Sequence, residues 1–142
     1  MSDPREPFEL IRPLIVEATT VWNAAPPCVR VALEHGGELY TGEAALERDG
    51  SMAAPEIAAA GQATVAALDL LTPAAVEFAL EWSAAVSTRE GLPPVAATVV
   101  AVIVAGVPMR YAGAVLLDGD PATAGARSTL DALNRRLGVT GL

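Results

Sequence analysis

Ala59-Ala-Gly-Gln-Ala-Thr-Val-Ala-Ala-Leu68 is the stretch of sequence that decides the fold, because a similar stretch follows 65 residues later, Ala124-Gly-Ala-Arg-Ser-Thr-Leu-Asp-Ala-Leu133, with four of the ten positions identical. Upstream of it, Leu39-Tyr-Thr-Gly-Glu-Ala44 resembles Arg110-Tyr-Ala-Gly-Ala-Val115. A pair of prolines precedes these landmarks in both copies, and the landmarks follow one another in the same order. An internal repeat of this length indicates one structural unit that the chain uses twice.

Each copy is expected to contain strands and one closing helix. Strands are predicted at 28–35 and 38–47 with a helix at 55–71, and then strands at 95–105 and 109–118 with a helix at 121–137. Gly36-Gly37 and Gly106 tolerate positive φ, so each pair of strands is predicted to be a hairpin. Asp120 before Pro121 predicts an N-cap followed by the first helical position.

One further apolar segment precedes the prolines of each copy, within 8–22 and 75–88. In the second segment Phe78, Leu80 and Trp82 alternate with more polar residues, and this period of two predicts a strand. The first segment fits a strand or a short helix that ends before Pro13. We therefore predict an α+β fold of two pseudosymmetric β-β-β-α repeats, with mostly antiparallel sheet and the helices packed on one face.

Composition supports a single folded domain over residues 1–142, with the repeats at about 8–72 and 75–138. Hydrophobic residues make up 52% of the chain and charged residues 18%, which provides a substantial core. The net charge is −8 and the chain has no lysine, so we expect no nucleic-acid partner. The absence of lysine beside abundant alanine, valine and arginine is typical of a GC-rich bacterial genome.

The sequence also indicates where the protein is located and how it assembles. Cys28 is the only cysteine and the N-terminus is acidic rather than positively charged, so we expect a cytoplasmic protein without a signal peptide. Gly91–Met109 carries one long uncharged run, but its prolines and β-branched residues predict a buried strand and no membrane span. Because strand 95–105 is apolar on both faces, we expect a homodimer or larger assembly.

Candidate chemistry is sparse, since the chain has no phosphate-binding glycine loop, CxxC, HExxH or GxSxG motif. His35 is predicted at a solvated hairpin turn and Cys28 as a small buried side chain. Asp118 and Asp120 fit a turn and helix cap better than a cation site, and Glu77 with Glu81 fits a solvated strand face better than an acid–base pair. We expect no catalytic residues, no metal and no cofactor.

The residues with the best potential to bind a ligand are Tyr40 and Tyr111, which occupy equivalent places in the two copies. Together with Arg110, Gly42 and Gly113 they would line a pocket between the units. The alternative is that each Tyr-x-Gly strand packs its ring over backbone left bare by glycine. The two tryptophans, Trp22 and Trp82, are predicted in the core or at an interface.

The second copy, from Met109 to Leu137, is similar to the end of the C-terminal regulatory domain of 2-isopropylmalate synthase. Both have an aromatic-x-Gly strand, an Asp-containing turn, an alanine-rich helix and a closing Asn-Arg. The resemblance implies two β-β-β-α units in a dimeric domain that binds leucine as a feedback inhibitor. Ser51–Glu56 differs from that family's Gly-rich entry to the first helix.

Three classes of function follow. The first is a non-catalytic small-ligand-binding or regulatory module that acts as a dimer, with a metabolite such as a branched-chain amino acid as ligand. The second is a dimeric scaffold that binds a protein partner, and the third is a small enzyme. A regulatory module predicts a pocket between the units, a scaffold predicts a flat exposed apolar patch, and an enzyme predicts a cleft with shifted pKa values.

Overall fold

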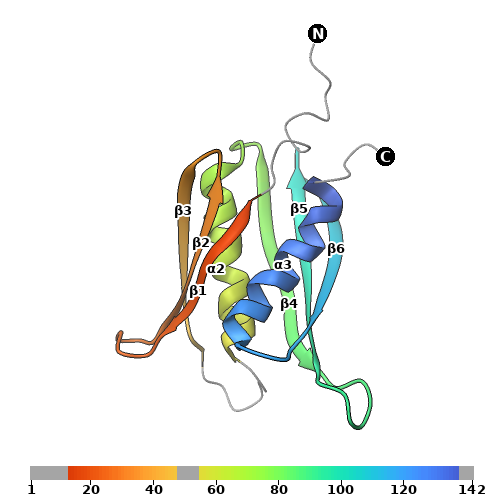
Figure 1. Cartoon of the computed structure of the whole chain (residues 1–142). Helices are drawn as coiled ribbons and strands as arrows, with labels where there is room; N and C mark the ends of the chain where they lie inside the picture. Colours follow the sequence, from red (N-terminus) through yellow and green to blue (C-terminus); the bar gives the residue numbers. More distant parts are fainter. Residues whose placement is uncertain (1–12, 48–54, 138–142) are drawn as a thin grey trace.

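The computed structural model describes residues 13–47 and 55–137, which form two three-stranded antiparallel sheets and two helices (Figure 1). The elements are β1 (Leu14–Val21), β2 (Cys28–His35), β3 (Glu38–Ala45), α2 (Pro55–Leu71), β4 (Val76–Val86), β5 (Val95–Val104), β6 (Val107–Leu116) and α3 (Pro121–Leu137). The α+β class with two β-β-β-α repeats is confirmed.

Both helices lie between the two sheets. Helix α2 packs on β2 and β3 of its own sheet and reaches β4 of the other, and α3 packs on β5 and β6 and reaches β1 (Figure 1). The helices also pack against each other. Each sheet therefore has an inner face that covers the helices and an outer face that points away from them.

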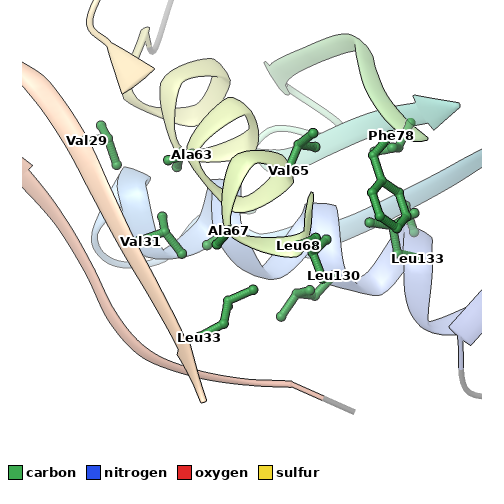
Figure 2. Packing of buried hydrophobic residues seen from close by; sticks show 14 of the residues in the cluster. Val29, Val31, Leu33, Ala63, Val65, Ala67, Leu68, Phe78, Leu130 and Leu133 are labelled. Carbon is green, nitrogen blue, oxygen red and sulfur yellow. The ribbon is translucent and has the colours of Figure 1, made fainter. Parts of the chain in front are cut away.

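The central strands and the helices supply most of the core. Figure 2 shows Val31 and Leu33 of β2, Leu68 of α2 and Leu133 of α3 converging between the sheets. All four side chains are fully buried. Because an inner face alternates with an outer face along each strand, only every second residue of β2 enters this core.

Two-residue turns close both predicted hairpins. Gly36 and Gly37 have φ of 62° and 80°, and Ala105 and Gly106 have φ of 53° and 78°. Two successive residues with positive φ are typical of a type I′ turn, whose twist matches that of the flanking strands. In consequence, Leu33 pairs with Tyr40 in the first hairpin just as Val100 pairs with Tyr111 in the second.

The first strand of each unit contains a β-bulge, and this changes one prediction. In β4 the register shifts between Leu80 and Trp82, so Trp82 moves to the outer face, where 48% of its surface is exposed. The predicted alternation that placed Trp82 with Phe78 and Leu80 is therefore wrong beyond Leu80. An extra residue in one strand reverses the side on which every later side chain points.

Residues 14–21 form the strand β1, so the strand alternative is confirmed for this part of the first segment. The alternative helix before Pro13 and the predicted turn at Asp49-Gly50 lie outside the described residues. The uncharged run contains β5, as expected for a strand. Among the described helices, none is both long and apolar enough to cross a membrane.

Candidate functional site

Tyr40 and Tyr111 occupy equivalent places on the inner faces of the two different sheets. Each is half-buried against the common core, across from the central strand of its own sheet. The Tyr40 hydroxyl also donates a hydrogen bond of 3.1 Å to Glu38, and this bond raises the pKa of Tyr40. The two rings thus pack on the hairpins of two different sheets.

Gly42 and Gly113 allow the helices to touch the edge strands. A Cβ added at Gly42 would lie 2.0 Å from the carbonyl oxygen of Ala63, and one added at Gly113 would lie 2.3 Å from that of Ser128. These opposing atoms belong to helix backbone, which cannot rotate away. The glycine of each Tyr-x-Gly strand is therefore required for the contact between sheet and helix; the alternative placed a tyrosine ring over this backbone, and the nearest atoms belong to a helix instead.

Arg110 lies on the outer face, away from both tyrosines. Its Nε donates a hydrogen bond of 2.9 Å to Glu81, the residue at the β4 bulge. The predicted ligand-binding residues are thus divided between two inner faces and one outer face, and their binding of a ligand stays a prediction. Glu77 is exposed four residues before Glu81 along the same strand.

Asp120 acts as the predicted cap of α3. Its carboxylate accepts hydrogen bonds from the backbone N–H and the hydroxyl of Thr123, at 3.1 and 2.9 Å. His35 is half-buried at the end of β2, whereas Cys28 is only half-buried on the outer face and so does not belong to the core as predicted. Within residues 13–47 and 55–137, no three His, Cys, Asp or Glu side chains gather as metal ligands would.

Shifted pKa values occur at separate places. The hydrogen bond from Arg30 to Glu43, of 2.8 Å, raises the pKa of Arg30 on the outer face of the first sheet. Burial, and then the nearby charge of Glu77, raise the pKa of Asp69 at the end of α2. The raised pKa of Arg30 thus comes from its partner Glu43, and the raised pKa of Asp69 comes from burial and a like charge.

An open depression does lie between the two units. It is lined by the end of the first strand with Thr20 and Trp22, by Glu56 at the start of α2, and by Asp120 before α3. The depression thus brings a hydroxyl, an aromatic ring and two carboxylates together from both repeats. The residues predicted to line a pocket between the units include none of these. The repeat does not indicate that the two helices begin at the same end of the fold.

The outer faces of the two sheets differ in chemistry. Pairing in the second sheet aligns two cross-strand rows, Trp82–Val99–Ala112 and Ala84–Ala97–Ala114, which we call the apolar face. Equivalent pairing in the first sheet aligns Glu17–Ala32–Thr41 and Thr19–Arg30–Glu43, which we call the polar face. Each residue of the apolar face is half-buried or exposed, so this hydrophobic surface faces away from the core.

Sequence reasoning missed the apolar face as a surface, although it predicted that strand 95–105 needs cover on both sides. The bulge hid the outward position of Trp82, which is the largest side chain of the face. A comparison of equivalent positions in the two repeats provides the signal, because Glu17 corresponds to Trp82 and Arg30 to Ala97.

No protein-family model matches the chain, and no curated protein matches it significantly in sequence. The similarity of the second copy to the regulatory domain of 2-isopropylmalate synthase stays a prediction.

Proposed function

We propose that this chain is a non-catalytic interaction module that acts through a protein–protein interface on the apolar face. This is the scaffold class among the functions that the sequence allows. The observation that carries the proposal is the difference between equivalent rows of two sheets with the same fold: glutamate, arginine and threonine surround Ala32 in the polar face, whereas alanine, valine and tryptophan fill the apolar face.

Solvent exposure of such a surface is unfavourable. The largest apolar patch of an ordinary monomer covers about 300–600 Å², and such a patch is often functional. Around the apolar face, Leu116 and Val86 extend the same surface, with 58% and 39% of their areas exposed. Within the two rows of the polar face every residue except Ala32 is polar, so the fold does not require apolar residues at those positions, and their presence in the second sheet supports a role in binding.

The proposal is tested by measuring whether the apolar face is covered in cells, whatever covers it. In a Cys28→Ala background, cysteine is placed at Ala112 on the apolar face or at Thr41, its equivalent on the polar face. Both positions are exposed and directly precede the glycine of Tyr-x-Gly. A membrane-permeant maleimide should label the Thr41→Cys protein in intact cells several times faster than the Ala112→Cys protein.

The control is the same labelling of purified, unfolded protein, where the two cysteines should react at equal rates. Labelling of Ala112→Cys in cells as rapidly as Thr41→Cys would show an uncovered face and would refute the proposal. Expression at the natural level is needed, because an excess of the chain over its partner would leave most of the faces exposed.

A second candidate, the small-ligand regulatory module, is favoured by the depression between the units. Its two carboxylates, Glu56 and Asp120, and the hydroxyl of Thr20 suit a ligand with an amino group, such as an amino acid. The test is thermal unfolding against a panel of amino acids and branched-chain keto acids. A ligand at 100 times its Kd adds about 2.7 kcal/mol to stability, and a Glu56→Gln variant should lose much of that gain.

A further inference from the structure

We propose that the partner on the apolar face is a second copy of this chain, packed sheet to sheet about a twofold axis that runs parallel to β5. The inference rests on the proposed function, because it names the partner of the same surface. Three properties of the face support it: its area, the arrangement of large and small side chains, and the position of its charges.

The area of the outer face meets the requirement of a specific dimer. The sheet has three strands of ten or eleven residues each. At about 3.4 Å per residue and 4.8 Å between strands, the face measures about 34 by 14 Å, so two copies would bury about 1,000 Å². This is about the minimum for a biological interface, and the projecting Trp82 and Leu116 add to it.

The side chains of the face are self-complementary in size. A twofold axis along β5 places β4 of one copy over β6 of the other and keeps each cross-strand row opposite itself. Trp82 then faces Ala112 of the second copy, and Val99 faces its own equivalent on the axis. In both halves of the row, the large side chain of Trp82 thus faces the small side chain of Ala112. This arrangement lets the side chains of the two sheets interdigitate.

Charges at the end of the face favour the same axis. Arg110 on β6 is level with Ala79 on β4, because both pair with Ala101. Rotation about β5 therefore brings Arg110 over Ala79 of the second copy, between that copy's Glu77 and Glu81. An axis perpendicular to the strands would instead place β4 over β4 and bring glutamates toward glutamates.

Sedimentation of purified protein tests the proposal with a matched pair of variants. The wild type should be a dimer, and Ala112→Lys, which buries an unpaired ammonium in the interface, should raise the dimer Kd by about 100-fold or more. Thr41→Lys places the same charge at the equivalent exposed site of the polar face and should leave the Kd unchanged. Circular dichroism of both variants checks that they are folded.

A charge exchange tests the geometry. Arg110→Glu makes the charged end of the face wholly negative, and the double variant Glu77→Lys/Glu81→Lys makes it wholly positive. Each should dimerise about tenfold or more weakly than the wild type, because like charges then meet, and an equal mixture of the two should regain dimers of mixed composition. Failure of the mixture to recover would overturn the proposed axis.

The outcomes separate this inference from the proposed function. If the purified protein stays monomeric at about 0.1 mM, where a complex with a Kd of about 10 µM is mostly formed, the second copy is excluded as partner. Protection of Ala112→Cys in cells would then still support an interface with another protein. A dimer that tolerates Ala112→Lys, or that Thr41→Lys breaks equally, would place the contact elsewhere and overturn the inference. A monomer with an unprotected face would refute both.

Discussion

Replacement of Gly113 by alanine tests the contact between sheet and helix on which the whole arrangement depends. The added Cβ would lie 2.3 Å from both the Ser128 carbonyl oxygen and the Ala132 nitrogen of α3, whereas ordinary contacts begin at 3.4 Å. The helix backbone must therefore move by about 1 Å. It has little room, because Gly125 on the same helix already holds it close to the carbonyl oxygen of Ile57 on α2.

We expect Gly113→Ala to lower the free energy of unfolding by about 3 kcal/mol, the upper range for an overpacked core, because backbone rather than a flexible side chain opposes the methyl group. For a domain of this size the melting temperature should fall by about 10 °C. Gly42→Ala should have a similar effect in the first unit, where the Cβ would lie 2.0 Å from the Ala63 carbonyl oxygen.

Gly119→Ala is the matched control, since its Cβ would meet nothing within 4 Å. Urea unfolding of all the variants at one fixed protein concentration gives the comparison, because a dimer's stability depends on concentration. If Gly113→Ala and Gly119→Ala differ by less than about 0.5 kcal/mol, the close approach of α3 to β6 is not a constraint on the fold and the reasoning fails.

Three further predictions concern single interactions. Ala105 has φ of 53° in its turn, so Ala105→Asn should raise the free energy of unfolding by about 0.5–1 kcal/mol, as measured by urea unfolding. Burial raises the pKa of Asp69 above its ordinary 3.8, so the charge of Asp69 destabilises the fold at neutral pH. This cost disappears as the pH falls through the raised pKa. Asp69→Asn should therefore raise the melting temperature at pH 7 and leave it unchanged below pH 3.8. The Thr98 hydroxyl lies 2.6 Å from that of Ser128 and 3.3 Å from that of Ser83, so Thr98→Val alone should cost about 1–2 kcal/mol, and Thr98→Val with both serines changed to alanine should cost less in the same urea assay.

The sequence predicts the fold well where local signals and the repeat agree. The helix from Pro121 to Leu137 begins where Asp120 and Pro121 indicate, and the turns lie at the expected glycines. Each signal is local: a cap satisfies free N–H groups at one helix end, and glycine permits positive φ. Because each landmark occurs twice, an element assigned wrongly in one copy would conflict with the equivalent element in the other copy.

The face of a strand is less predictable than its position. Alternation in β4 holds from Val76 to Leu80 and then reverses at the bulge around Glu81. No residue type in this segment marks an inserted position, and the bulge depends on pairing with β5, which is distant in sequence. The candidate site was correspondingly harder to predict than the fold: Arg110 was grouped with the tyrosines, although the strand directs it to the opposite face from Tyr111.

Duplication of the unit explains why the outer faces carry functional information. Inner-face residues of both copies must fit one shared core, so equivalent positions there stay similar in size: Val31 of the first sheet corresponds to Thr98 of the second, and Ala63 to Ser128. The outer faces have no such common constraint. In the two rows of the polar face the first copy carries mostly polar side chains, as water favours on an exposed sheet, and it therefore serves as an internal reference for the second. Against that reference, Trp82 lies half-exposed where the first copy has Glu17, and this is the difference that the proposed interface would explain.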